Sequence, residues 1–556
     1  MVQDPLTARE HGVAKTVEGM HLVVPDDSWI GDGPSTHQIA VVDLDLRTGV
    51  ATPPAVYEPP AGRRKMGRFR LAKPYDLYSP EFIQVAAFAA AAKTIRTMDL
   101  DRVLGHPMRW RDPGRPLRIL PRAGRWANAR YDRDRQELQF FYFDHPADAT
   151  QTIYTALARD IVAHECAHAV IDGIAPFLYD SNTPQTLAIH EAIADLCAVL
   201  TSFRSGSLTT TVLERTGGRI GDSTAFSAIA PQFGRALSSN GHSTALRNLR
   251  NDRRLPPPAA QVDVHRLSEV LSGLLYGGLA HLQDGRARHF DFSRSGFLLA
   301  QSARRVQRLI LRALDLLPAA DVSFADYLRC LVYAAAKEDE WVTGHMAWEY
   351  GEEVDFFVEE AVRRGIVDRP EDLVDDEAPA DDDPLTPDQM RRLAADDDYA
   401  VEFVGGRRHR IGIPEGARFT ILARRPSSIW VEVEGRSGSI DELLVKVAWE
   451  DREEIGGSHG PARERIVRRG ATIVIGGSRA GYVDAVIRGG FDPLRAERDA
   501  FLGWSERAGL LTPRPAAGKI LVTDVAGGQT PGRRRIAAAR PRIRWTLTGP
   551  SGTIRS

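Results

Sequence analysis

Hydrophobic and polar residues alternate in two stretches near the start of the chain. Residues 36–57 alternate through QIAVVDLDL and then turn at Arg47, Thr48 and Gly49, which predicts a strand and a hairpin. Residues 130–143 alternate again and predict a pair of strands. Between them, an alanine-rich stretch follows Ser79 and Pro80, which suit the cap and first turn of a helix over residues 81–97. Residues 1–150 are therefore expected to form a β-rich lobe.

The pattern changes to helical spacing after residue 150. Apolar residues recur on one helical face at Ile153, Leu157, Ile161 and Ile171, and helix is predicted for most of residues 151–370. The stretch DDEAPADDDPLTP combines like charges with proline, which predicts a linker over residues 371–390. Segments such as RFTILA and ATIVIGG, separated by Gly, Pro and Ser, predict a small β-rich domain over residues 391–556.

Composition changes this picture little. The chain has 556 residues, 43% hydrophobic and 26% charged, which is ordinary for a globular protein of roughly two to four domains. The net charge of −2 provides no large field that would attract nucleic acid or an anionic membrane, so neither is an expected partner. The arginine-rich end, GRRRIAAARPRIRW, could touch an anionic partner, although a solvated basic face is the more common arrangement.

Cysteine content and the N-terminal sequence bear on the compartment. Three cysteines do not make a disulfide framework, which favours a reducing environment. The N-terminus lacks a basic start followed by an apolar stretch, and the longest apolar run, near residues 85–92, falls short of the roughly 20 residues that span a bilayer. A cytoplasmic protein without a membrane span is expected, and export by a non-classical route stays open.

The segment DIVAHECAHAVIDG contains two histidines four residues apart, His164 and His168. On a helix they share one face, where two neutral imidazoles can occupy two corners of a zinc tetrahedron. Glu165 would lie beside the metal and could accept a proton from zinc-bound water. The alternative is a chance HExxH on a surface helix.

A catalytic zinc needs a third protein ligand on a neighbouring element. After Asn182 or Thr183, either of which can cap a helix, and Pro184 in the first turn, the chain reads QTLAIHEAIADLCAVL. Glu191 and Asp195 share a face of that helix. If the helix packs antiparallel to the first one, Glu191 can reach the zinc and Asp195 can accept the outer N–H of a ligand histidine. The alternative, two solvent-facing acids, conflicts with the broad apolar side of this helix.

These residues resemble the thermolysin-like metallopeptidases, the gluzincins, in which HExxH is followed on the next helix by Glu-x-x-x-Asp, here EAIAD. The resemblance runs from about residue 80 to residue 365. It implies an α+β fold of two lobes, an N-terminal β-rich lobe and a C-terminal helical lobe, to which the β-rich domain is appended. It also implies Zn²⁺ as cofactor, with Asp195 supporting His164.

The resemblance extends to residues around the metal. Tyr179, in APFLYD, sits where the family places a tyrosine that hydrogen-bonds the tetrahedral intermediate. His265, in VHRLSEVLSGLLYGG, matches a histidine that steadies the oxyanion. Asp172, in AVIDG, also fits as an outer support of the metal helix.

Further positions concern substrate and a second metal. Arg247, in ALRNLRND, resembles the arginine that holds a substrate carbonyl, and ANARYD resembles the Asn-Ala that begins the edge strand on which substrate is laid, which carries over Asn128 and Ala129. Two departures stand out. The stretch from Tyr179 to the third ligand is longer, and no acid follows Asp195 until Glu214, which argues against calcium dependence.

The predicted function is a zinc-dependent endopeptidase that acts on peptides or proteins, with Glu165 as general base. A second hypothesis is an inactive zinc-bound scaffold that binds a partner through its C-terminal domain. A third, a structural zinc site, would be closed by four ligands rich in cysteine, whereas Cys166 faces away from His164 by helical phase.

Overall fold

The structure is a computed structural model, and it describes part of the chain. The described residues are 30–63, 66–71, 76–98, 100–146, 148–181, 183–204, 206–222, 225–231, 234, 245–258, 261, 263–289, 291–343, 352–373, 383–433, 436–455, 463–477, 480–489, 494–507, 511–512, 520–524 and 534–537. The first 29 residues, Asn182, residues 374–382 of the predicted linker and the end of the arginine-rich stretch lie outside them. The last part of the predicted linker is helical, since α12 begins at Pro387. No described helix is long and apolar enough to cross a membrane.

The N-terminal part is built on a four-stranded sheet of order β1-β4-β6-β5, in which β5 forms one edge and pairs antiparallel with β6. The alternating stretch predicted over residues 130–143 forms β5, β6 and β7, and the helix predicted over residues 81–97 is α2. The elements are β1 Ile39–Val41, β2 Tyr57–Glu58, β3 Arg68–Phe69, α2 Pro80–Met98, α3 Leu100–Val103, β4 Leu117–Leu120, β5 Ala129–Asp132, β6 Glu137–Phe140, β7 Tyr142–His145 and β8 Asp148–Tyr154.

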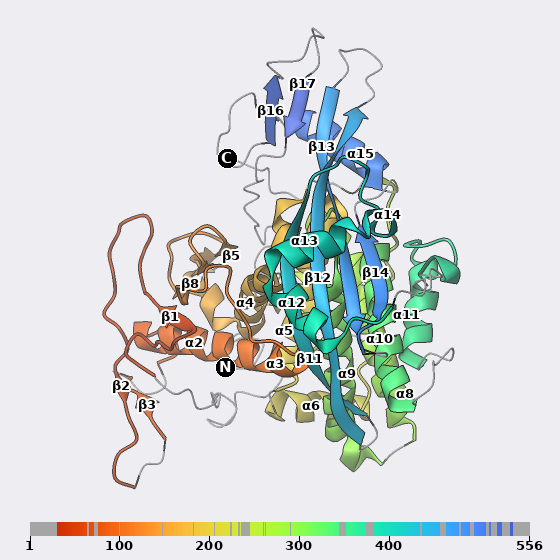
Figure 1. Cartoon of the computed structure of the whole chain (residues 1–556). Coiled ribbons are helices and arrows are strands. Elements are labelled where there is room, and N and C mark those ends of the chain that lie inside the picture. The colour runs from red at the N-terminus through yellow and green to blue at the C-terminus, as the bar shows by residue number, and fades with distance from the viewer. Residues whose placement is uncertain are drawn as a thin grey trace.

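The middle of the chain is helical, as the periodicity predicts, but the helices begin later than expected, because Ile153 lies on strand β8 and Leu157 in a 3-10 turn. Two helices, α4 and α5, lie at its centre, surrounded by the others (Figure 1). All residues of α5 are buried, and so are all residues of α4 except Gly173. The elements are α4 Arg159–Ile174, α5 Pro184–Ser202, α6 Gly206–Thr216, β9 Ala228–Ile229, β10 Arg247–Asn248, α8 Val264–Ala287, α9 Ser295–Leu316, α10 Phe324–Thr343 and α11 Glu352–Arg363.

The described C-terminal part contains the helices α12–α15 and a sheet larger than the N-terminal one. Its path is β11-β12-β13-β17-β16-β15, with β14 paired to β13. The elements are α12 Pro387–Ala395, α13 Asp397–Gly405, α14 Arg408–Ile411, β11 Phe419–Val433, β12 Arg436–Ile455, β13 Arg463–Gly476, β14 Val483–Gly489, α15 Arg495–Arg507, β15 Leu511–Thr512, β16 Ile520–Asp524 and β17 Arg534–Ala537. The described part of the chain is therefore mixed α+β, as predicted, while the thermolysin-like arrangement in two lobes stays a prediction.

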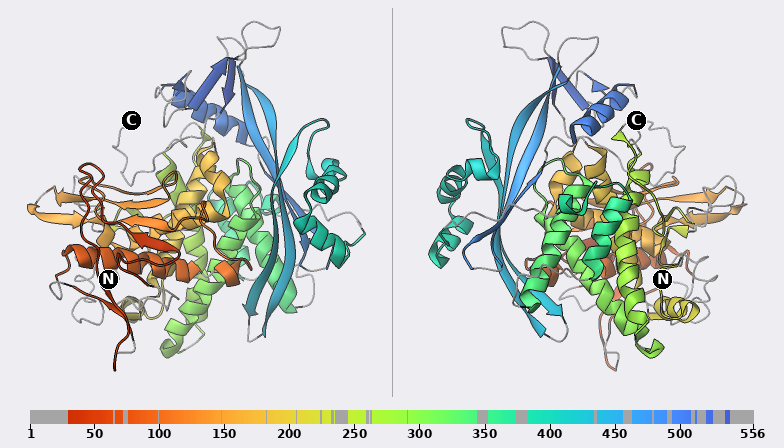
Figure 2. Two further views of the ribbon diagram at one scale, coloured as in Figure 1. Left: turned by 60° about the vertical axis from the view of Figure 1, so that its left-hand side comes forward. Right: turned by 90° about the vertical axis from the view of Figure 1, so that its right-hand side faces the viewer.

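The middle of the large sheet lies between α12–α14 on one face and the helical part of the chain on the other, as the two views in Figure 2 show. Alternate residues of β12 point in opposite directions, as in any strand. Leu443, Val445 and Val447 join the core under α12–α14. Leu444 and Ala448 join the core that also contains α4 and α5. The C-terminal sheet thus shares a hydrophobic core with the helical part of the chain.

Polar contacts follow the same junction. The ammonium group of Lys446 is buried on the face toward the helices, donates to the carbonyl of Leu317 at 3.1 Å and lies 5.5 Å from the ring centroid of Phe177. Burial lowers the pKa of Lys446 to about 8, although the Asp315 carboxylate opposes that shift. Asp315 also accepts from Arg425 of β11 at 2.7 Å. Buried charges need such partners, and here each partner comes from the other side of the junction.

We predict that Leu444→Ala lowers the free energy of unfolding of the whole chain by about 2–5 kcal/mol, because it removes a buried side chain from the shared core. Chemical denaturation of the full chain measures this loss. Leu422→Ala on the neighbouring strand is the matched control, since Leu422 is 50% exposed and its loss leaves no cavity. Equal stability of the two variants would contradict a shared core.

Candidate metal centre

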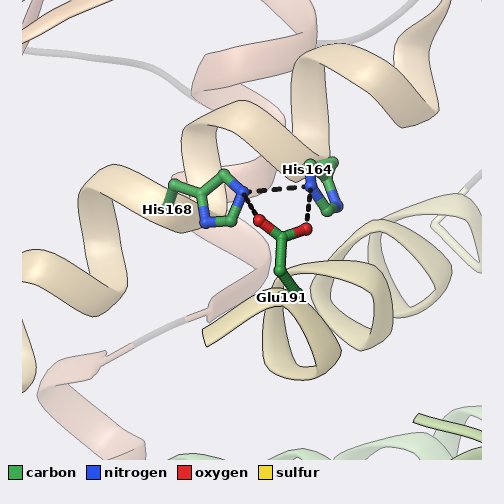
Figure 3. Close-up of side chains that lie close together, drawn as sticks. All are labelled: His164, His168 and Glu191. Carbon is green, nitrogen blue, oxygen red and sulfur yellow. Dashed lines mark hydrogen bonds and ion pairs between the residues drawn. The ribbon is translucent and has the colours of Figure 1, made fainter. Parts of the chain in front are cut away.

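Helix α4 presents His164 and His168 on one face, one turn apart (Figure 3). Their Nε2 atoms are 3.0 Å apart, and the two ring planes are nearly perpendicular. Both imidazoles are 2% exposed. The i, i+4 spacing therefore brings one ring nitrogen of each histidine close together inside the protein.

Helix α5 packs against α4 and supplies the third residue, Glu191. Its Oε2 lies 3.4 Å from Nε2 of His164, and its Oε1 lies 3.4 Å from Nε2 of His168. One ligand atom from each of the three side chains falls within 4.8 Å of the other two. This buried group of two imidazoles and one carboxylate could bind a metal ion.

Helix α5 begins at Pro184, as its sequence predicts, and Thr183 is the N-cap residue. The Thr183 side chain does not cap the helix. Its hydroxyl instead contacts the hydroxyls of Ser181 and Thr186, at 3.1 and 2.6 Å. The start of this helix is therefore fixed by a buried chain of hydroxyls.

The outer nitrogen of His164 meets Asp195, one turn beyond Glu191. The Nδ1 of His164 is 2.9 Å from Oδ1 of Asp195, so a neutral ring with its proton on Nδ1 keeps a lone pair on Nε2. Arg247 donates to both oxygens of Asp195, at 2.6 and 2.8 Å. Asp195 is thus held from both sides and orients the first histidine toward the cluster.

The outer nitrogen of His168 meets a residue that the sequence interpretation did not single out, His190. The two Nδ1 atoms are 2.7 Å apart and the rings stack at 4.7 Å. If His168 donates from Nδ1, then His190 accepts there and carries its own proton on Nε2. His190 directly precedes Glu191 in the sequence, which could have drawn attention to it. Adjacent residues on a helix point in different directions, however, so helical phase did not place His190 beside the candidate ligands.

Electrostatics separates the two candidate ligand histidines. Burial lowers the pKa of His164, but its hydrogen bond to Asp195 and the nearby Glu191 carboxylate, 3.4 Å away, outweigh burial and raise the pKa to about 10. Burial dominates at His168 and lowers its pKa to about 3. Burial raises the pKa of Glu191, but the nearby His265, His168 and His164 outweigh it and hold the pKa well below its usual range. Without a metal, the cluster therefore keeps one positive charge on His164.

The donor set suits a cation. Both carboxylate oxygens of Glu191 are buried, and neither has a hydrogen-bond partner among the residues that the structure describes. The neutral His168 directs the lone pair of Nε2 at the same point. A buried carboxylate and two nitrogen lone pairs are stabilised when a divalent ion takes the place of the single proton. Imidazole and carboxylate ligands of this kind are those of catalytic zinc sites.

Glu165 follows His164 on α4 and is 2% exposed. Burial raises its pKa to about 7, with a smaller contribution from the negative charge of Glu191. The charge of His164 and the nearby backbone N–H of Tyr131, on β5, lower the Glu165 pKa in part. The Glu165 side chain thus lies between its own helix, α4, and the edge strand β5, and its pKa is suited to proton transfer at neutral pH.

His265 and Tyr179 both lie near the cluster. The Nε2 of His265, near the start of α8, is 3.8 Å from Oε2 of Glu191, and its side chain is 26% exposed. The ring of Tyr179 packs edge-on against His190 at 4.2 Å, and burial raises the Tyr179 pKa well above its usual value. The sequence placed both residues at the site, and the structure brings both to the neighbourhood of the three ligands.

Asp172 and Arg247 each form contacts that hold parts of the structure together. Asp172, on α4, accepts from the Tyr131 hydroxyl at 3.0 Å and from Nε of Arg133 at 3.0 Å, and the structure places it on none of the three candidate ligands. Arg247, at β10, is buried against Asp195. Asp172 therefore holds β5 to α4, while Arg247 supports the histidine that Asp195 orients.

Asn128 and Ala129 lie where the edge strand β5 begins. The carbonyl of Asn128 accepts from the N–H of Phe141, and so faces the neighbouring strand. Backbone groups alternate along a strand, so the N–H and C=O of Ala129 face away from β6, on the same side as the Tyr131 N–H that reaches Glu165. Both residues are buried.

Comparison with models of known protein families gave no match, and neither did comparison with curated proteins. The chemistry of the site is therefore argued from the geometry and charge of its own residues.

We predict that metal binding releases about one proton. Below pH 10 His164 holds a proton that a metal must displace, so the apparent affinity for Zn²⁺ should rise about tenfold per pH unit from pH 6 to 8. Competition titration with a zinc chelator measures the affinity. Asp195→Asn removes the carboxylate that raises the His164 pKa, so it should weaken binding about 10- to 100-fold and flatten the pH dependence. An affinity independent of pH would contradict this account.

Proposed function

We propose that this protein is a zinc-dependent endopeptidase. The observation that carries the proposal is the buried group of His164, His168 and Glu191, with Glu165 beside it. Three protein ligands, two of them imidazoles, are typical of catalytic zinc, whereas structural zinc usually has four ligands rich in cysteine. When bound in such a site, Zn²⁺ lowers the pKa of a coordinated water to about 7 and polarises a substrate carbonyl.

Glu165 is the proposed general base. Its carboxylate takes a proton from the attacking water and later gives it to the leaving amine. A pKa near 7 supports both steps, because the group is partly ionised at neutral pH and yet acidic enough to return the proton. A bound cation would lower the Glu165 pKa from this raised value and increase the ionised fraction of the carboxyl.

His265 and Tyr179 are the proposed donors to the carbonyl oxygen as it becomes an anion. Burial keeps the Tyr179 hydroxyl protonated by raising its pKa, and a protonated hydroxyl can donate. His265 lies on the Glu191 side of the cluster, 3.8 Å from that carboxylate, and retains 26% exposure through which substrate can approach. A donor in this role typically contributes about 2.7–4 kcal/mol to the lowering of the barrier.

The edge strand β5 is the proposed docking strand for substrate. It lies at the end of the four-stranded sheet, its Ala129 backbone faces away from β6, and its Tyr131 N–H reaches the base. An extended peptide added to this edge would pass beside Glu165, since backbone pairing fixes its position. The arrangement also supports the proposed thermolysin-like plan, with substrate between a β-rich lobe and a helical lobe.

An inactive metal-bound scaffold is the alternative from another functional class. The buried Glu165, with its pKa raised to about 7, supports the peptidase over the scaffold. Burying an ionisable carboxyl destabilises the fold, and a scaffold has no need of such a group. The alternative predicts a metal-loaded protein that cuts no peptide.

We predict that Glu165→Gln retains one bound zinc and lowers the rate of peptide hydrolysis about 100- to 10,000-fold, because the amide is neutral and accepts no proton. Metal analysis and initial rates on a quenched peptide measure the two properties on one sample. Glu402→Gln, at an exposed position of α13, is the control that should leave both unchanged. Hydrolysis at the wild-type rate by Glu165→Gln would remove this residue from the role of base.

We also predict that the wild-type chain cleaves peptides blocked at both ends, that a zinc chelator abolishes the cleavage, and that added Zn²⁺ restores it. Blocked termini distinguish an endopeptidase from an enzyme that needs a free end. Mass spectrometry of a peptide-library digest would identify the cut positions. A fully zinc-loaded protein without cleavage would favour the scaffold.

A further inference from the structure

A cavity of about 370 Å³ lies between α2, α3, α9 and β11. Six of its lining residues are basic, and none is acidic: they are Lys93, Arg96, Arg102, Arg204, Arg304 and Arg308. The cavity lies where the C-terminal sheet meets the rest of the chain, since the N–H of Ser428 on β11 donates to the carbonyl of Gly105 just after α3. Arg96, Arg102 and Arg304 are exposed to solvent, and such a concentration of like charge attracts anions.

Most of this positive charge has no counter-charge within the part of the chain that the structure describes. Arg308 pairs with Glu338 at 3.0 Å. Lys93, Arg96, Arg102 and Arg304 form no ion pair with a described acid. The net charge of the chain, −2, hides this local excess.

A buried guanidinium strengthens the same field. Arg159, at the start of α4, is 3% exposed, and its Nε and Nη1 have no hydrogen-bond partner among the described residues. Burial lowers the pKa of Lys93, and the charges of Arg159 and Arg204 lower it further. Cations that depress one another's pKa are stabilised by an anion placed between them.

The remaining wall is aromatic and neutral. Trp430, on β11, lines the cavity and is 41% exposed. The amide of Gln307 donates to the carbonyls of Thr97 and Met98, at 2.7 and 2.9 Å, so these acceptors at the end of α2 are already occupied. An indole face beside a cationic wall is suited to a ligand that has both an aromatic ring and phosphate groups.

We propose that this cavity binds a nucleotide. Its phosphates would lie among Lys93, Arg96 and Arg304, because guanidinium groups form paired hydrogen bonds to phosphate oxygens. Its base would stack on Trp430. The volume lies within the usual range for small-molecule sites, and a pocket of this size accommodates a single nucleotide and not a strand. Trp430 belongs to the C-terminal sheet and the cations to the helices, so the ligand joins the two.

The direct test is calorimetric titration of the full zinc-loaded chain with ATP, inorganic tripolyphosphate and adenosine. Excess Mg²⁺ prevents the phosphates from extracting the zinc. We expect saturable binding of ATP and of tripolyphosphate that weakens as salt is raised, and none of adenosine. Thermal unfolding should shift upward with ATP, since ligand binds the folded state.

Two variants assign the binding to this cavity. Arg96→Gln combined with Arg304→Gln should weaken both ATP and tripolyphosphate at least tenfold. Trp430→Ala should weaken ATP about tenfold and leave tripolyphosphate within twofold, because only the base stacks. Arg391→Gln on α12 and Leu422→Ala on β11, both exposed and outside the cavity, are the controls and should change neither.

The proposal is overturned if the wild-type chain binds neither ATP nor tripolyphosphate, or if the control variants weaken binding as much as the cavity variants do. It is also overturned as a nucleotide site if Trp430→Ala affects both ligands equally. Binding is measured without hydrolysis of any peptide. The result therefore does not depend on whether the metal centre is a peptidase.

Discussion

The proposed active site depends on the packing of α4 against α5. Glu191 reaches both imidazoles because the two helices are surrounded by core on nearly every side and have one relative orientation available. Successive residues on a helix differ by about 100° in direction. A shift of one residue along α5 would therefore turn Glu191 away from His164 and His168. Complete burial of the two helices therefore fixes the relative positions of the three candidate ligands.

Burial also separates the carboxyl groups by function. Asp195 is held by Arg247 and His164, and Asp172 by Tyr131 and Arg133, so both carboxyl groups have hydrogen-bond partners. The pKa of Glu191 lies well below its usual range, while that of Glu165 is raised to about 7. Neighbouring acids whose pKa values are driven apart are suited to different tasks. The first is suited to hold a cation, and the second to move a proton.

The C-terminal sheet is continuous in packing with the rest of the chain. Leu444 and Ala448 of β12 lie in the same core as α4 and α5, and Lys446 between them reaches across to Leu317. The basic cavity lies on this junction, and α2, which forms part of its wall, packs on α4. A ligand in this cavity would therefore contact both α2, which packs on α4, and Trp430 of the C-terminal sheet.

The sequence by itself determined the elements whose periodicity is strong and the histidine pair of the candidate site, because i, i+4 positions share a helical face in any surroundings. It indicated Glu191 as the third ligand only on the condition that α5 packs against α4, which the tertiary structure decided. It also indicated Glu165 and the positions of His265 and Tyr179, the latter two through family likeness. Only the tertiary structure decided that His190 meets His168, that Asp172 serves β5, and that β12 shares the central core. Each of these contacts joins residues on different elements or on different faces of one, and local periodicity contains no information about which elements meet.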